Sequence, residues 1–268
     1  MSASHVVVRK ARDAASGRPV RVLALHGLAA TATTWRAYAQ HAAPAAEVWT
    51  ADLPWGQGGG PEWSRRGNPA DSIGTALEQV PGGVDLLIAH SYSALLALEH
   101  LAAAPREARP GALVVVSPFH RRDPAHFHWD TAQHYLGIFQ DVFDEALGLG
   151  STRPLDAGLR RDMALLIRDQ VGPYGWLRFY DSYLRSPFLD TAALDLPVLV
   201  TAGRADRFAP PEDAVALAGA LPHGRLRLWD DCGHFPMTEQ PRLFADAVDA
   251  FAADCLPRHA TPTEVSGA

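Results

Sequence analysis

Residues 86–98, with the sequence LLIAHSYSALLAL, decide the fold of this chain. The apolar run that begins at Leu86 stops at Ser91, where a helical pattern of apolar residues begins. Ala89 and Ser93, two positions to either side of Ser91, are small, as a crowded turn requires. The segment therefore predicts a strand, a sharp turn that exposes the Ser91 hydroxyl, and a helix whose first N–H groups suit a developing anion.

Length and composition narrow the class of protein. The 268 residues suffice for one large α/β domain or a domain with a lid, and 47% are hydrophobic and 20% charged, as in a soluble globular enzyme. The net charge of −6 argues against a nucleic acid partner. No run approaches ~18 apolar residues and residues 1–12 lack a signal-peptide core, so we expect no membrane association. Cys232 and Cys255 fit a reducing cytoplasm and are too few for a metal site.

Strand and helix patterns alternate along most of the chain. Strands are predicted at residues 5–9, 20–25, 47–51, 85–89, 112–117, 198–202 and 225–229. Helices are predicted at residues 32–42, 71–79, 91–103, 211–221 and 241–253. This alternation indicates an α/β fold with a mostly parallel sheet and helices on both faces.

The alternation is interrupted once. Residues 119–194 lack strand signals and are rich in aromatic residues at helical spacing, which indicates a helical lid or cap inserted between two parts of the core, residues 1–118 and 195–256. Residues 257–268 lack a hydrophobic pattern and are predicted to be disordered.

Five short motifs occur in an order that resembles the α/β-hydrolase superfamily over nearly the whole chain. They are His26-Gly27-Leu28, the 52–56 loop DLPWG, the 89–93 turn AHSYS, the 203–206 loop GRAD, and Gly233-His234-Phe235 followed by Glu239 and Pro241. The resemblance implies a sheet of about eight strands with a helical lid. The chain departs from the family's Gly-x-Ser-x-Gly turn, because Ala89 and Ser93 replace both glycines.

The predicted chemistry centres on a catalytic triad. Ser91 is the candidate nucleophile, although a serine that merely caps a helix is the simpler alternative. His234 is the candidate base and Asp206 the acid that orients it, in the chain order expected for this fold. Asp230 and Asp231, which are closer to His234 in sequence, are the rival acids, and we expect them to cap a turn instead.

The oxyanion hole and substrate pocket are predicted less directly. The backbone N–H groups of Leu28 and Tyr92 would hold an oxyanion, with Ala29 as the alternative to Leu28. Candidate pocket residues are Trp55, Trp129, Phe139 and Trp176, and the Tyr92 side chain is a further candidate. Packing within the lid is the alternative role for the lid aromatics.

These features predict a cofactor-free, metal-free serine hydrolase whose partner is a small-molecule acyl substrate. The expected substrate is a small to medium, partly apolar ester, lactone or thioester. A C–C bond hydrolase with the same triad is an alternative, as is a biosynthetic lyase, cyclase or acyltransferase that reuses the pocket. A non-catalytic binding module is a third class.

Overall fold

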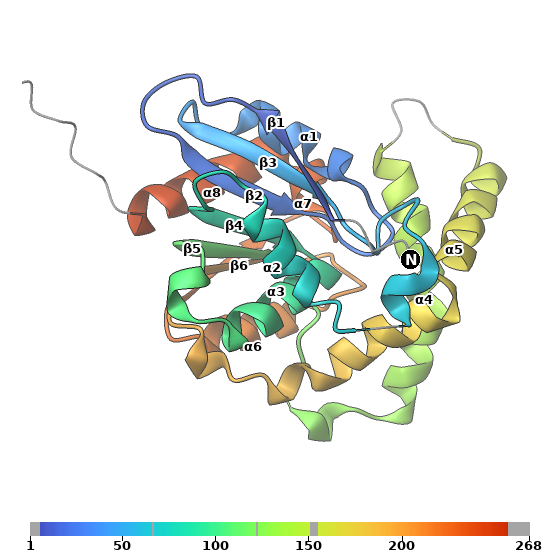
Figure 1. Cartoon of the computed structure of the whole chain (residues 1–268). Coiled ribbons are helices and arrows are strands. Elements are labelled where there is room, and N and C mark those ends of the chain that lie inside the picture. Colours follow the sequence, from blue (N-terminus) through green and yellow to red (C-terminus); the bar gives the residue numbers. More distant parts are fainter. Residues whose placement is uncertain (1–5, 66, 122, 151–154, 257–268) are drawn as a thin grey trace, which may run out of the picture.

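A mostly parallel sheet forms the centre of the computed structural model, which describes residues 6–65, 67–121, 123–150 and 155–256. The seven strands lie in the order β1-β3-β2-β4-β5-β6-β7 (Figure 1). Each neighbouring pair is parallel except β1 and β3, which are antiparallel. The strands are β1 (Val7–Arg12), β2 (Val20–Leu25), β3 (Ala46–Asp52), β4 (Leu86–His90), β5 (Ala112–Val116), β6 (Val198–Gly203) and β7 (Gly224–Trp229).

The three strands β4, β5 and β6 consist entirely of buried residues. This explains why their sequences are mostly apolar, because a parallel sheet is covered on both faces. Successive side chains of β4 enter opposite layers. Leu87 and Ala89 pack in one hydrophobic cluster, and Leu86 and Ile88 pack in the other. Burying each large aliphatic side chain stabilises the fold by about 1.5–3 kcal/mol.

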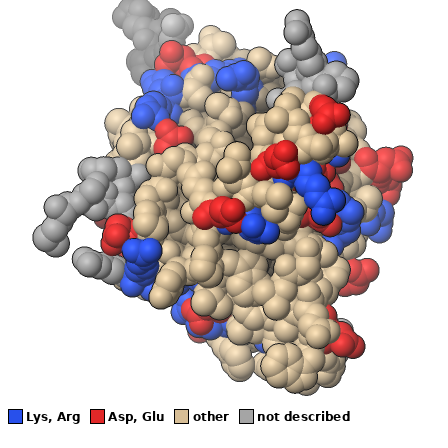
Figure 2. Space-filling model, turned by 90° about the vertical axis from the view of Figure 1, so that its right-hand side faces the viewer, with Lys and Arg blue, Asp and Glu red and all other residues tan. Residues whose placement is uncertain are grey.

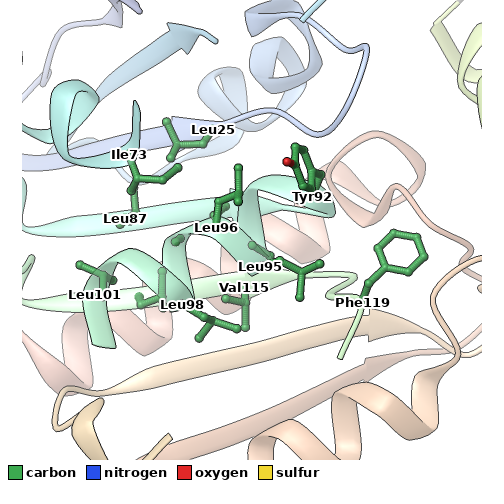
Figure 3. Close-up of a cluster of buried hydrophobic side chains, with 14 of the residues drawn as sticks. Leu25, Ile73, Leu87, Tyr92, Leu95, Leu96, Leu98, Leu101, Val115 and Phe119 are labelled. Carbon is green, nitrogen blue, oxygen red and sulfur yellow. The ribbon is translucent and has the colours of Figure 1, made fainter. Parts of the chain in front are cut away.

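Helices cover both faces of the sheet. One layer contains α2 (Asp71–Glu78), α3 (Tyr92–Ala103) and α6 (Pro211–Ala220), and the other contains α1 (Arg36–His41) and α8 (Pro241–Cys255). Figure 3 shows the leucines of α3 directed toward Leu87 and Val115 of the sheet. The buried helix α3 thereby fixes the turn at Ser91, the residue directly before the helix, to the centre of the core.

Between β5 and β6, every described element is helical. The two long helices are α4 (Trp129–Gly150) and α5 (Ala157–Arg185), and they stand beside the sheet rather than on a face of it (Figure 1). The helix α5 is interrupted at Gly172, whose φ of 65° glycine adopts without steric cost because it has no Cβ atom. The next residue, Pro173, has no backbone N–H group to donate to the helix. In the described part of the chain, no helix is long and apolar enough to cross a membrane.

The structure refines the sequence predictions at several points. All seven strand ranges correspond to strands, whereas the family resemblance implied about eight. The predicted helix 32–42 consists of a 3-10 turn (Ala32–Trp35) followed by α1. A short helix, α7 (Pro236–Glu239), was not predicted. Residues 257–268, predicted to be disordered, lie outside the described residues.

Candidate active site

Ser91 occupies a strained turn between β4 and α3. Its φ of 56° and ψ of −120° are unfavourable for a residue with a side chain. The turn is held in place from both sides, because the Ser91 N–H donates to the Val116 carbonyl at 2.8 Å and α3 is buried in the core. This backbone conformation directs the Ser91 hydroxyl away from the strand and toward His234.

Three buried side chains form a continuous hydrogen-bonded chain at the carboxyl ends of the parallel strands. Ser91 Oγ lies 3.1 Å from His234 Nε2, and His234 Nδ1 lies 2.8 Å from Asp206 Oδ2. Ser91 is 7% exposed, Asp206 5% and His234 1%, so the water that would weaken these contacts is largely excluded. The structure thus brings together the three residues predicted to form the triad.

The Asp206 carboxylate has a fixed orientation. Its second oxygen, Oδ1, accepts the backbone N–H groups of Phe208 and Ala209, both at 2.9 Å. Oδ2 therefore has no hydrogen-bond partner other than His234 Nδ1 among the described residues. Of the two alternative acids, Asp230 has an 85% exposed side chain that pairs with Arg204, and the Asp231 side chain forms no described bond to His234.

Glu239 holds the loop that carries His234, a role that its place in the motif did not reveal. Its two carboxylate oxygens accept the N–H groups of Gly233 at 2.7 Å and Phe235 at 2.8 Å, on either side of the histidine. The sequence signal was only the position of Glu239 after His234 in the motif. The short helix α7 supplies the geometry, because it turns the chain back toward its own start.

Two further histidines support the site as neutral groups. The His90 ring N–H at Nε2 donates to the His234 carbonyl at 2.9 Å, and burial lowers the pKa of His90 well below its ordinary value. His26 bonds the Gly27 carbonyl through Nδ1 and accepts the Leu53 N–H through Nε2. Burial lowers the pKa of His26 to about 4. Both rings therefore act as uncharged braces between loops at neutral pH.

Two backbone donors are available beside Ser91. Neither the Leu28 nor the Tyr92 N–H has a hydrogen-bond partner among the described residues. The Ala29 N–H, the alternative donor, instead donates to the Trp55 carbonyl at 2.8 Å. The geometry thus leaves Leu28 and Tyr92 as the pair free to receive an oxyanion.

A cavity of about 680 Å³ opens from Ser91 and His234. It runs between the loop that follows β2 and the facing sides of α4 and α5. None of Trp55, Trp129, Phe139 and Trp176 lines it. The side chains that do line it from α4 and α5 are mainly aliphatic, together with Phe143.

The four predicted pocket aromatics have other environments. Trp55 is buried against Trp63 and Tyr92, and its indole N–H bonds Ser93. Trp129 is 85% exposed at the start of α4. Phe139 and Trp176 pack on each other across α4 and α5, with ring centroids 6.1 Å apart. Their positions depend on the relative rotation of two helices, which helical spacing alone does not define.

The comparisons with known proteins agree with this arrangement. Residues 22–247 match the model of the alpha/beta hydrolase family, and the chain belongs to that family. A 2-hydroxymuconate semialdehyde hydrolase from Pseudomonas putida is 34% identical over 76 residues, which are 28% of this chain and 27% of that enzyme. The match therefore spans about a quarter of the relative's length.

Solved structures share the fold at low sequence identity. A meta-cleavage product hydrolase is 17% identical, with a TM-score of 0.60, and the match covers 93% of this chain and 94% of the other. An N-acyl homoserine lactone degrading enzyme is 16% identical, with a TM-score of 0.61, and the match covers 92% of this chain and 96% of that enzyme. At such identities the likeness establishes the fold alone.

Proposed function

We propose that this chain is a serine hydrolase that cleaves a carboxylic ester, lactone or thioester through an acyl-enzyme intermediate. The observation that carries the proposal is the unbroken chain of contacts from Ser91 through His234 to Asp206. A serine hydroxyl is a weak nucleophile until a base removes its proton. A neutral imidazole held by a buried carboxylate is suited to that task near pH 7.

In the acylation step, His234 Nε2 takes the Ser91 proton as Oγ forms a bond to the substrate carbonyl carbon. The carbonyl electron pair moves to oxygen, and the Leu28 and Tyr92 N–H groups hold the oxyanion. The oxyanion then re-forms the carbonyl and expels the alcohol or thiol, which receives the proton from Nε2. Asp206 stabilises the imidazolium throughout and keeps its proton on Nδ1.

Deacylation repeats these steps with water as the nucleophile. His234 takes a water proton while the oxygen bonds the acyl carbon, and it returns that proton to Ser91 Oγ as the acid leaves. A partly apolar acyl group suits the aliphatic wall that α4 and α5 present to the cavity.

The test is covalent labelling with a fluorophosphonate, together with hydrolysis of p-nitrophenyl esters of increasing acyl length. We expect Ser91→Ala to abolish labelling and to lower kcat by about 10³-fold or more, and Asp206→Asn to lower it by about 10²–10⁴-fold. Ser72→Ala, a change in the surface helix α2, is the matched control. A folded wild-type protein that neither labels nor turns over any ester would refute the proposal.

A C–C bond hydrolase is the second candidate, favoured by the match to the 2-hydroxymuconate semialdehyde hydrolase and by the meta-cleavage product hydrolase fold. The same triad serves both reactions, so the two functions are separated by substrate. Turnover of 2-hydroxymuconate semialdehyde, followed by product chromatography, should exceed ester turnover in kcat/KM if this candidate is correct. Slower turnover than the best ester would exclude it as the main activity.

A further inference from the structure

The cavity beside Ser91 has two chemically different walls. Val142, Leu147, Met163 and Ile167 belong to an apolar wall formed by α4 and α5. The opposite wall follows the segment from Gly27 to Gln40 and carries hydroxyl and amide groups. A ligand that fills this space must therefore be apolar along one side and hydrogen-bonding along the other.

Arg36 is the only Lys, Arg, Asp or Glu side chain among the described residues that line the cavity. It lies at the start of α1 and is exposed. No hydrogen bond or ion pair to a described residue engages its guanidinium, which leaves its N–H donors available to a ligand. A guanidinium presents paired donors that match the geometry of a carboxylate or phosphate.

Arg36 belongs to a rim that the cavity shares with a second hollow of about 580 Å³. Thr33, Arg36 and Gln40 line both spaces. These residues are three and four positions apart, so consecutive turns place them on one side of the helical segment. The other cation of the second hollow, Arg12, is already engaged, because its guanidinium donates to the carbonyls of Ala39 and Ala43 at 3.0 Å each.

We propose that Arg36, flanked by Thr33 and Gln40, forms an anion subsite, and that the substrate carries a carboxylate or phosphate remote from the bond cleaved at Ser91. The inference rests on the proposed hydrolase function for its catalytic readout. The apolar part of such a substrate lies against α4 and α5, and its anionic end reaches the shared rim. The chain's net charge of −6 disfavours anions in general, so a cation at the shared rim that has no partner among the described residues is a selective feature.

The experiment compares matched anionic and neutral esters on the wild type, Arg36→Gln and Arg242→Gln. Arg242 is an exposed arginine of α8 that lines neither hollow, so its variant controls for net charge. One substrate series carries the anion on the acyl side, as p-nitrophenyl esters of dicarboxylic acids beside those of alkanoic acids. The other series carries the anion on the leaving group. It compares the butyrate ester of 4-hydroxybenzoate, which is anionic, with the butyrate ester of 4-hydroxybenzamide, which is neutral.

We expect Arg36→Gln to lower the ratio of anionic to neutral kcat/KM by about three- to tenfold in one of the two series, mainly through KM. The series that responds identifies which side of the scissile bond carries the anion. In the wild type, 0.5 M NaCl should reduce the same ratio, because salt screens an exposed ion pair. Arg242→Gln should leave the ratio unchanged.

A binding measurement separates failure of this inference from failure of the hydrolase proposal. In the Ser91→Ala background, calorimetry compares monomethyl octanedioate, which is anionic, with dimethyl octanedioate, which is neutral. Tighter binding of the anion that Arg36→Gln removes would support the subsite even if no ester is turned over. Equal binding of the two, or an unchanged ratio in both ester series, would overturn the subsite even if neutral esters are hydrolysed.

Discussion

Ser93 occupies a position where the family turn has a glycine, and the structure gives its hydroxyl a specific role. Ser93 Oγ donates to the His26 carbonyl and accepts the Trp55 indole N–H at 3.1 Å. All three residues are buried. One hydroxyl thereby joins the helix after the nucleophile to the two loops that shape the oxyanion region.

We expect Ser93→Ala to lower the free energy of unfolding by about 1–3 kcal/mol, because it leaves the Trp55 N–H buried without an acceptor. Alanine favours helices more than serine does, so helix propensity does not explain such a loss. Urea unfolding measures the effect, with Ser72→Ala on α2 as the control. An unchanged denaturation midpoint would mean that the hydroxyl is dispensable.

Glu239 is a positioning residue for His234. Each oxygen of Glu239 accepts one N–H group, and glutamine replaces one of these oxygens with an NH2 group that can only donate, so Glu239→Gln should loosen the loop. We expect kcat on a p-nitrophenyl ester to fall by about tenfold or more with little change in KM, since charge-assisted bonds of this kind contribute about 1.5–3 kcal/mol.

The control for this prediction is Glu107→Gln, which removes an equal charge from an exposed 3-10 turn. A rise in KM with unchanged kcat in Glu239→Gln would assign the residue to substrate binding rather than to orientation of the histidine.

At the scale of the elements, the end of β6 and the histidine loop are packed too closely for any side chain between them. A Cβ atom at Gly203 would lie 2.0 Å from the Cys232 carbonyl oxygen and 2.3 Å from that of Gly233. Both contacts are with backbone, so the loop itself would have to move. The glycine therefore sets how near His234 can approach the strands that carry Asp206 and Ser91.

We predict that Gly203→Ala displaces the histidine loop, lowers stability by about 2–4 kcal/mol and abolishes most ester hydrolysis. Gly219→Ala is the matched control, because nothing lies within 4 Å of a Cβ there and alanine favours the helix α6. Thermal unfolding and kcat/KM measured on both variants check this. Full activity in Gly203→Ala would show that the loop tolerates the shift.

Sequence patterns anticipated that Ser91, Asp206 and His234 would lie together, because each residue follows the end of a strand. Apolar runs mark β4 and β6, and parallel strands place their carboxyl ends at one edge, which brings Ser91 and Asp206 together. The pocket aromatics were predicted poorly. Whether Trp176 faces the cavity depends on how α5 is rotated against α4, and that rotation is a tertiary property.

At the scale of the whole molecule, charge is distributed without a dominant sign on the face in view. Figure 2 shows acidic and basic side chains interspersed there, with uncharged surface between them. Among the described residues, several charged side chains are paired, as in the contact of Arg160 with Asp144 at 2.9 Å. This face therefore shows no extended basic patch, and under our proposal discrimination between small charged ligands depends on Arg36 at the shared rim.

We expect buried histidines to make the stability of the whole fold sensitive to acid. Burial lowers the pKa of His120, which is 5% exposed, from 6.5 to about 4. Because the unfolded chain binds this proton more tightly than the folded one, the neutral ring's contribution to stability is present above pH 6.5. It is lost as the pH falls toward 4. Asp213 opposes this trend, since burial raises its pKa to about 7.

A variant comparison isolates the histidine contribution from the opposing carboxylate. Replacing His120 with glutamine removes one titration while any packing cost stays the same at every pH. Between pH 7.5 and 4.5, the wild type should therefore lose about 1–3 kcal/mol more unfolding free energy than His120→Gln does. Urea titrations at both pH values measure the difference, and exposed His128→Asn is the control. Parallel losses in wild type and His120→Gln would contradict a lowered pKa of His120 in the folded protein.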